Sequence, residues 1–301
     1  FVGAGYLGGQ WFGMAKFSFM FGLVQLAASA TSAVSQNAID FALKQMEWRP
    51  LFNAVGVFGT GLFVLGAIFI KNPTPVVSAS RGGPVAFFSA VTHNLLEVCK
   101  IPHVWVASLN GAAMFGVLLA LGVVWGPKLL MVRGATETQA VLGSSMIWVG
   151  LAVGSAIIPW WSDRIKQRKL PIVAGTAVQF LAVALLVYWS DIGITVDLAL
   201  CFILGFANAA HMLAFSTAAD VVEPRQIGTS AAVVNGIMFI VAGIIMARPG
   251  VRIDRAIEKG MERGSLELAQ YASVPFVAAM ALALVLALLM KETFPNGPKT
   301  R

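Results

Sequence analysis

The chain holds 301 residues, of which 58% are hydrophobic and 12% are charged, with a formal net charge of +7. A soluble domain carries roughly 25% charged residues, so this composition excludes an ordinary soluble protein. The positive charge is then best explained by loops on one side of a membrane, because no basic and aromatic run lies on a polar face to bind nucleic acid. We predict an all-helical protein that crosses a membrane many times.

The chain begins with Phe1 rather than Met, inside an apolar segment that ends near Trp11. No charged region precedes this segment, so it does not have the form of a signal peptide. A helix needs about 20 apolar residues to cross a bilayer, and this segment is too short. We interpret it as the end of one span, and we expect the natural N-terminus to lie upstream.

Eight longer apolar runs follow, and each is long enough to span a bilayer. Polar or charged turns separate most of them. The runs cover residues 17–41, 51–70, 103–131, 136–161, 170–189, 194–219, 227–247 and 271–290.

Residues 71–101 differ in kind from these runs. Between Pro73 and Pro84 the segment is rich in Pro, Gly and Ser, which is typical of a linker. From Val85 to Val98, apolar residues recur at helical spacing beside polar ones. This pattern predicts an amphipathic helix at the membrane surface, or equally a helix that packs on the protein.

The densest charged turn lies within GSAIIPWWSDRIKQRK, at residues 154–169. Short loops rich in Lys and Arg stay on the cytoplasmic side of a membrane. Alternation from this turn places the linker, the 220–226 turn and the C-terminus on the cytoplasmic side. The segment 248–270 falls on the opposite side with five basic and four acidic residues, which makes it a weak exception.

Polar side chains inside the spans are the candidates for a binding site, because they are costly in lipid unless they face a cavity or a partner helix. One set recurs at intervals of four, three and four on a single helix face: Gln25, Ser29, Ser32 and Gln36. Later spans carry Asn110, Asn208, His211 and Asn235.

Two interpretations of these residues stay open. They contact a substrate in a cavity, or they bond across packed helices. His211 is the one candidate that titrates near neutral pH, which adds proton coupling as a possible role. Trp105, Trp148 and Met114 are further cavity candidates, although aromatic residues at such spacing more often pack.

The turn PWWSDRIKQRK resembles the Gly-x-x-x-Asp-Arg-x-Gly-Arg-Arg loop of the major facilitator superfamily, in its second-half copy. The matching residues are Asp163, Arg164 and Arg168. The departures are Pro159 and Lys166 at the two glycines and Gln167 at one arginine. GAGYLGGQWF resembles the end of span four, EWRPLFNAVG the start of span six and MKETF the exit of span twelve. EPRQIGTSAAVVNG resembles the start of span eleven in a bacterial branch related to phagosomal amino-acid and nucleoside transporters.

This resemblance implies an all-α membrane protein with a major-facilitator-type helical bundle. The family's layout is two six-helix halves. Residues 1–70 would then be the remnant of the first half, with the end of span four and spans five and six, or about two and a half spans. Residues 71–101 would be a cytoplasmic linker with an amphipathic helix, and residues 102–301 a complete second half.

The resemblance also implies a function, namely secondary active transport of a small organic solute by alternating access, with H⁺ or another ion as the coupling partner. A drug or siderophore exporter of the same fold is the alternative. An intramembrane enzyme is less favoured, because no span centre holds an Asp or Glu. We expect a monomer in a bacterial inner membrane, with no cofactor, metal or nucleic acid.

Asp163, with Arg164 and Arg168, is the candidate for a conformational latch. Pseudo-symmetry would place its carboxylate near the start of the span at residues 16–18, where the positive end of a helix favours it by about 0.3–1 kcal/mol. The alternative is a loop carboxylate that pairs only with Arg164.

Overall fold

The computed structural model describes residues 3, 7, 11–12, 17–71, 83–190 and 193–295, and these form helices joined by short turns, with no strand among them. The all-helical fold class is thus confirmed. The helices are α2 (Phe17–Leu43), α3 (Trp48–Phe69), α4 (Gly83–Cys99), α5 (Pro102–Leu119), η2 (Ala120–Trp125), α6 (Gly126–Val132), α7 (Glu137–Ile165), α8 (Lys169–Tyr188), α9 (Ile194–Asn208), η3 (Ala209–Met212), α10 (Leu213–Ala219), η4 (Pro224–Gln226), α11 (Ile227–Glu258) and α12 (Leu266–Leu289).

Within the described residues, seven segments are long and apolar enough to cross a membrane. They are Trp48–Phe69, Pro102–Val132, Glu137–Ile165, Lys169–Tyr188, Ile194–Ala219, Pro224–Glu258 and Leu266–Leu289. The sequence prediction counted residues 17–41 as a further span. That segment does form a helix of 27 residues, α2, and its crossing of the membrane stays a prediction.

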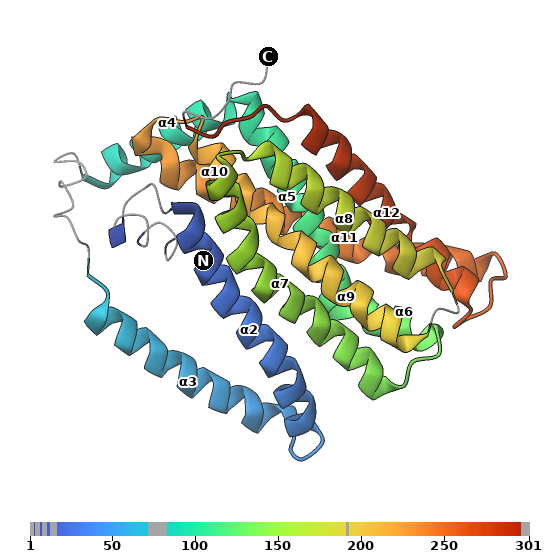
Figure 1. Cartoon of the computed structure of the whole chain (residues 1–301). Helices are drawn as coiled ribbons and strands as arrows, with labels where there is room; N and C mark the ends of the chain where they lie inside the picture. The colour runs from blue at the N-terminus through green and yellow to red at the C-terminus, as the bar shows by residue number, and fades with distance from the viewer. Residues whose placement is uncertain are drawn as a thin grey trace.

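The helices form one bundle in which α7 lies between α2 and α9 (Figure 1). On the other side of the bundle, α5 packs on α11 and α12, and α8 packs between α9 and α12. Figure 1 also shows α3 standing apart at one edge of the bundle and α4 lying across its upper end. No residue of α3 is buried, which fits a helix whose apolar surface faces lipid or other protein.

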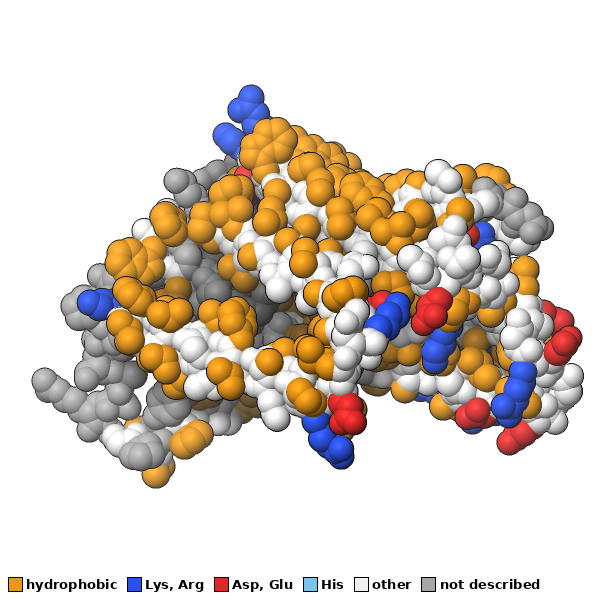
Figure 2. Space-filling view, turned by 90° about the horizontal axis from the view of Figure 1, so that it is seen from below, with side chains coloured by type: hydrophobic (Ala, Val, Ile, Leu, Met, Phe, Trp, Pro, Cys, Tyr) orange, Lys and Arg blue, Asp and Glu red, His pale blue; other side chains and the backbone are white. Residues whose placement is uncertain are grey.

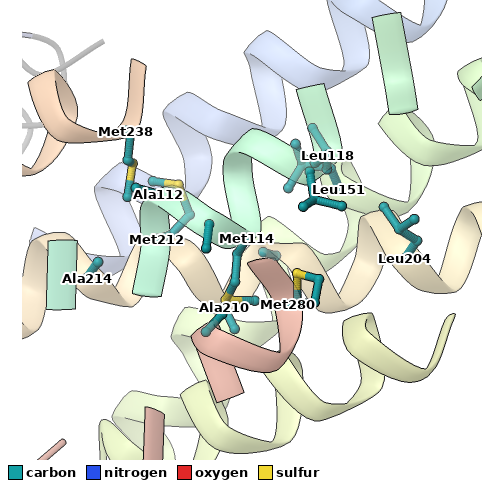
Figure 3. Close-up of a cluster of buried hydrophobic side chains, with 14 of the residues drawn as sticks. Ala112, Met114, Leu118, Leu151, Leu204, Ala210, Met212, Ala214, Met238 and Met280 are labelled. Carbon is teal, nitrogen blue, oxygen red and sulfur yellow. The ribbon is translucent and has the colours of Figure 1, made fainter. Parts of the chain in front are cut away.

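The centre of the bundle is filled by methionines and alanines around α5 (Figure 3). Met114 and Met280 are fully buried here, and Ala210 leaves room for their long side chains. Methionine is unbranched, so it fills irregular gaps between helices that cross at different angles. The core therefore lies inside the group of helices from α5 to α12.

The close packing of α7 against α9 depends on glycine. A Cβ at Gly205 would strike the carbonyl oxygen of Ile147, and a Cβ at Gly150 would strike that of Phe202. Small residues of this kind let two helix backbones approach closely in a membrane. At Gly150 and Gly205 the two helices therefore touch backbone to backbone.

Two spans lose regular α-helical geometry at membrane depth. In the span Pro102–Val132, residues 120–125 form a π-helical stretch, and the side-chain amide of Gln36 donates to the carbonyl of Gly122 there at 3.0 Å. In the span Ile194–Ala219, a 3₁₀ turn at residues 209–212 interrupts the helix. Irregular backbone inside a membrane is tolerated where it is buried in protein or lines a cavity. We therefore expect protein or a cavity beside each of these two breaks.

Two element boundaries differ from the sequence prediction. Helix α7 continues to Ile165, so Asp163 and Arg164 lie in its last turn and the turn itself is short. Lys166 adopts the left-handed conformation there, with φ 55°, which explains why the related motif has glycine at this position. Helix α11 continues to Glu258 through Pro249, so about half of the charged 248–270 segment is helical rather than loop.

Candidate functional site

A cavity of about 190 Å³ lies between α2 on one side and the helices α5, α7, η3, α10 and α11 on the other. Three of the eight predicted binding residues line it: Gln25 from α2, His211 from η3 and Asn235 from α11. The remaining lining residues are Ala28, Phe115, Trp148, Phe215, Met238 and Phe239. The structure therefore brings together polar side chains that are separated by more than 200 positions in the sequence.

The imidazole of His211 is held in one orientation. Its Nδ1 lies 2.7 Å from the carbonyl oxygen of Asn208, and its ring stacks on Phe115 with the ring centres 5.1 Å apart. A carbonyl oxygen can only accept a hydrogen bond, so Nδ1 carries the hydrogen. In the neutral ring Nε2 is then the acceptor, and His211 can offer it to a donor on a ligand.

Gln25 supplies the polar contact from the α2 side of the cavity. Its amide nitrogen donates to the hydroxyl of Ser29 at 2.9 Å, and both side chains are buried. Ser29 thus fixes the rotamer of Gln25, one helical turn away. The predicted polar face of α2 supplies one side chain that lines the cavity and a second that orients it.

Aromatic rings form much of the cavity wall. Phe115 meets Phe239 edge to face with the ring centres 5.6 Å apart. The ring of Phe215 stacks on the ring of Phe21 with the ring centres 5.0 Å apart, and this contact joins α10 to α2. Among the residues that the structure describes, none of those that line the cavity carries a carboxylate, an ammonium or a guanidinium group. The cavity therefore suits a solute with an apolar or aromatic body and a few hydrogen-bonding groups.

Two predicted binding residues lie between helices rather than in this cavity. Asn110 donates to the carbonyl of Ala283 at 2.9 Å and to the hydroxyl of Thr176 at 3.3 Å. Asn208 donates to the carbonyl of Met114 at 2.7 Å and to Gln179 at 3.1 Å. These bonds link α5 with α8, α12 and α9, which is the role of interhelical glue that the sequence left open.

The lower part of the polar face of α2 lies outside the cavity as well. Ser32 donates to the carbonyl of Ala28 in its own helix at 2.9 Å. Gln36 lines a second cavity of about 370 Å³, together with residues such as Asp40 and Ser144. Its neighbour Asn37, which the sequence analysis did not single out, donates to the hydroxyl of Ser145 at 2.8 Å and ties α2 to α7.

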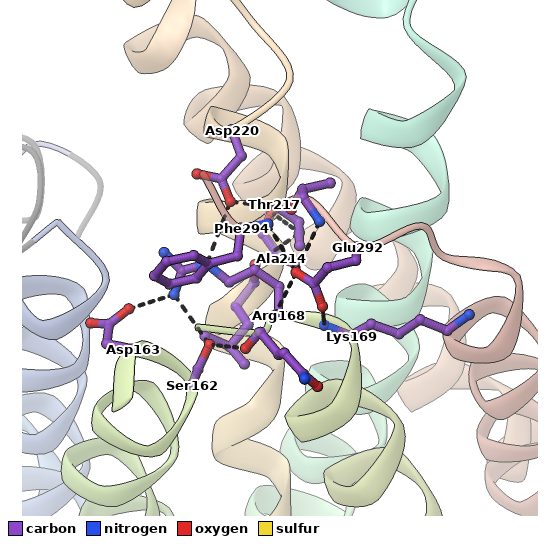
Figure 4. Close-up of polar contacts among 12 residues, drawn as sticks. Ser162, Asp163, Arg168, Lys169, Ala214, Thr217, Asp220, Glu292 and Phe294 are labelled. Atoms are coloured by element: carbon purple, nitrogen blue, oxygen red, sulfur yellow. Dashed lines mark hydrogen bonds and ion pairs between the residues drawn. The ribbon is translucent and has the colours of Figure 1, made fainter. Parts of the chain in front are cut away.

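Arg168 is the centre of the polar network at the basic turn (Figure 4). Its guanidinium donates to Asp163 at 2.6 Å and Ser162 at 3.1 Å, and it lies 3.4 Å from Asp220. Arg168 is buried, whereas Arg164 is exposed and forms no ion pair with a described carboxylate. The alternative of a loop carboxylate that pairs only with Arg164 does not hold, because Asp163 bonds to Arg168. Arg164, in the last turn of α7, points outward.

The segment after α12 closes this network. Both carboxylate oxygens of Glu292 accept backbone N–H groups at the start of α8, from Arg168 at 2.8 Å and Lys169 at 3.1 Å. Thr293 donates to Asp220 at 3.1 Å. The turn, the end of α10 and the C-terminal segment therefore meet at one end of the bundle, as the alternation of loops predicts.

Asp220 is a largely buried carboxyl group of this network. Burial raises its pKa, while the charge of Arg168 and the hydroxyl of Thr293 act in the opposite direction. The group lies just beyond the span Ile194–Ala219. Neither Asp220 nor Glu292 was singled out by sequence reasoning. Asp220 directly follows an apolar run and Glu292 follows one after Lys291, so their position at the end of a span is the signal that could have identified them.

At the opposite end, Arg133 and Asp197 form a buried ion pair at 2.8 Å. Arg133 also donates to the carbonyls of Leu186 and Trp189, which end α8. Paired and fully hydrogen-bonded charges of this kind can lie inside a protein. The pair fixes the ends of α6, α8 and α9 to one another, and neither of its residues lines the cavity.

Residues 1–247 match the sequence family described as Major Facilitator Superfamily. The chain belongs to the major facilitator superfamily. This superfamily is one of membrane transporters, so the helical bundle is that of a major facilitator transporter, and the resemblance seen in the Asp163 turn is confirmed at the level of the family. A comparison with curated protein sequences finds no match.

Three phenylalanines that line the cavity were not predicted from the sequence. In this major facilitator, Phe115, Phe215 and Phe239 shape the cavity as much as its polar residues do. In the sequence they are ordinary members of apolar runs. Only the packing of α2 against α7 and α10 shows which side of each helix faces the cavity.

Proposed function

We propose that the chain works as a secondary active transporter that moves a small organic solute by alternating access. The observation that carries this proposal is the position of the cavity, between α2 and the helices from α5 to α11, with hydrogen-bonding groups from both sides. A site at such a boundary can open to one side of the membrane when the two groups of helices rock against each other.

The proposal divides the chain as the family's layout does. Residues 1–70 belong to the first half, as the end of span four and spans five and six. Residues 71–101 form a cytoplasmic linker, and residues 102–301 form the second half. The support for this division is that α2 contributes to the cavity wall from outside the tightly packed group α5–α12.

For the substrate we propose an uncharged or zwitterionic solute with an aromatic or apolar body, such as an amino-acid-like or nucleoside-like compound. Gln25, His211 and Asn235 would bind its polar groups, and the rings of Phe115 and Phe239 would hold its apolar part. The lining without carboxylates favours this solute class over the organic cations that many drug exporters carry.

Uptake into proteoliposomes that contain the full-length protein tests this proposal. A panel of neutral amino acids, nucleosides and lipophilic cations should show uptake of a neutral class. Asn235→Ala and Gln25→Ala should each raise the KM for that class about 3- to 30-fold, which corresponds to the loss of one or two hydrogen bonds. Asn110→Ala should instead lower thermal stability, because this residue bonds between helices. Transport of cations alone would contradict the proposed substrate class.

For the membrane orientation we propose that the 162–169 turn and the C-terminus lie on the cytoplasmic side. A cysteine placed at Gln167, in a variant that lacks Cys99, should react with a membrane-impermeant thiol reagent only after the cytoplasmic side is opened. The other native thiol, Cys201, is buried and adds little background. Labelling of position 167 from outside intact cells would overturn the orientation.

A further inference from the structure

A pocket of about 290 Å³ lies between α6, α11 and α12, and the residues that line it are distinct from those of the cavity that holds His211. Its wall is mostly apolar, with Leu129, Ile253, Ile257, Leu268 and Phe276 among its residues. It lies near the end of the bundle opposite the basic turn, because it involves the last turns of α6 and the first turns of α12. Figure 2 shows the molecule from below, with charged side chains gathered toward the side of the α11–α12 connection and apolar ones over much of the rest.

Two cations, Lys128 and Arg263, are the only charged residues among the described ones that line this pocket. The ammonium of Lys128 lies over the ring of Trp125, 4.7 Å from its centre, and the indole N–H of Trp125 donates to the carbonyl of Met246 at 2.9 Å. The ring is thus fixed and holds the ammonium beside the pocket. Within the described part of the chain, no carboxylate lies within ion-pair distance of either cation.

A neighbouring cation, Arg252, differs from these two because its guanidinium is bonded within the protein. Arg252 donates to the carbonyl of Tyr271 at 2.8 Å, and its guanidinium lies 3.9 Å from the centre of the Tyr271 ring. Pro275 has no N–H to offer that carbonyl, so Arg252 satisfies an acceptor that the helix leaves free. Neither Lys128 nor Arg263 donates to an acceptor on a residue that the structure describes, so both can bind an outside anion.

The two cations are at the level where a bilayer places its headgroups. Lys128 lies four residues before the end of its span at Val132, and Arg263 lies three residues before the start of α12. Basic pockets between membrane helices bind anionic headgroups. A free phosphate would use the cations but not the apolar chamber behind them, whereas a lipid would use both.

We propose that this pocket is a binding site for an anionic phospholipid, with an acyl chain between α6, α11 and α12 and the headgroup phosphate between Lys128 and Arg263. The lipid would hold α12 against α6 and α11 where these helices leave a gap. The site is separate from the proposed transport cavity, so its test does not depend on the substrate.

Fluorescence quenching in reconstituted full-length protein tests the proposal. The probes are phosphatidylglycerol and phosphatidylcholine with brominated acyl chains, which quench nearby tryptophan. The part of the signal that is lost in Trp125→Phe reports on this pocket. We expect phosphatidylglycerol to quench Trp125 at a lower lipid fraction than phosphatidylcholine. Lys128→Gln and Arg263→Gln should each reduce this preference about fivefold, since one interfacial cation contributes about 1 kcal/mol.

Matched variants separate this site from a general attraction to charge. Arg255→Gln and Lys259→Gln remove exposed cations of the same segment that do not line the pocket, and they should keep the preference. Ala269→Phe fills the chamber and should lower the quenching of Trp125 by both lipids. Equal quenching by the two lipids in the wild type would overturn the proposal. So would an equal loss in the control variants, or full competition by inorganic phosphate, which would show a small-anion site.

Discussion

The carboxylate of Glu292 accepts the backbone N–H of Arg168 at 2.8 Å, although the two residues are 124 positions apart. The same carboxylate also accepts the N–H of Lys169, so it occupies the N-terminus of α8, where the helix leaves N–H groups without partners. A negative charge is favoured there by the helix dipole as well. The segment after the last span is thereby fixed to the basic turn.

Glu292→Gln should lower the stability of the protein by about 0.5–2 kcal/mol, because it keeps the shape of the side chain but removes the charge that satisfies the start of α8. Thermal unfolding in detergent measures the effect. Glu262→Gln is the matched control, because Glu262 is exposed in a loop and forms no ion pair with a described residue. Equal stability of the two variants would show that the cap contributes nothing.

Asp163 lies where a latch between the two groups of helices is expected. Gly22 of α2 packs against the carbonyl of Ser155 and the ring of Pro159, and Asn37 bonds to Ser145, so α2 and α7 are antiparallel. Four residues past Pro159, Asp163 is then level with the first turn of α2. The side chains of residues 13–18, which include the predicted partner region, lie outside those that the structure describes.

Asp163→Asn in the full-length protein should reduce transport while expression stays near normal. The loss of a carboxylate at a helix N-terminus shifts the balance of two conformations by about 0.3–2 kcal/mol, or about 2- to 30-fold. Initial rates in proteoliposomes measure it. Lys166→Gln removes an exposed charge from the same turn and serves as the control. If the variant lost thermal stability and kept its transport rate, Asp163 would only position Arg168, to which it bonds at 2.6 Å.

Gly205 should tolerate no side chain, because its Cβ would meet the carbonyl of Ile147 on α7. Gly205→Ala forces α7 and α9 apart and should cost at least about 1–3 kcal/mol, the usual cost of overpacking. Gly236→Ala is the control, since no atom outside its own helix lies within 4 Å of a Cβ there. That change should be neutral or stabilising by up to about 1 kcal/mol. Thermal unfolding of the two variants should therefore shift in opposite directions.

The sequence predicts most of the helices because their signal is local. Apolar runs of span length and the charged turns between them give the positions of α7, α8 and α12 to within a few residues. The error at α11 arises from the charged residues that begin at Arg248, which suggest the end of a span, whereas the helix continues through Pro249 to Glu258. The family is predictable too, since Asp163 and Arg168 keep a recognisable spacing.

The site is less predictable because its geometry depends on contacts between distant segments. Asn110 and His211 are both polar residues inside apolar spans, and nothing local distinguishes their roles. The structure shows that Asn110 faces α8 and α12 and bonds to Ala283, whereas His211 faces α2 through a cavity. Which side of a helix meets a cavity is decided by how helices pack, and one sequence does not record that.

His211 is the sharpest test of the proposed cavity. Its Nδ1–H is bound to the carbonyl of Asn208, so the neutral ring presents Nε2 as an acceptor. A charged side chain at the centre of a membrane helix costs about 2.5–3.5 kcal/mol unless it is hydrated or paired, and the described residues that line the cavity include no carboxylate to pair with an imidazolium. We therefore expect His211→Gln to weaken substrate binding about tenfold and to keep the pH dependence of uphill transport. Counterflow and proton-driven uptake in proteoliposomes measure the two effects separately. Exchange that persists while accumulation is abolished would assign His211 to proton coupling instead, and intact kinetics with lower thermal stability would show a purely structural residue.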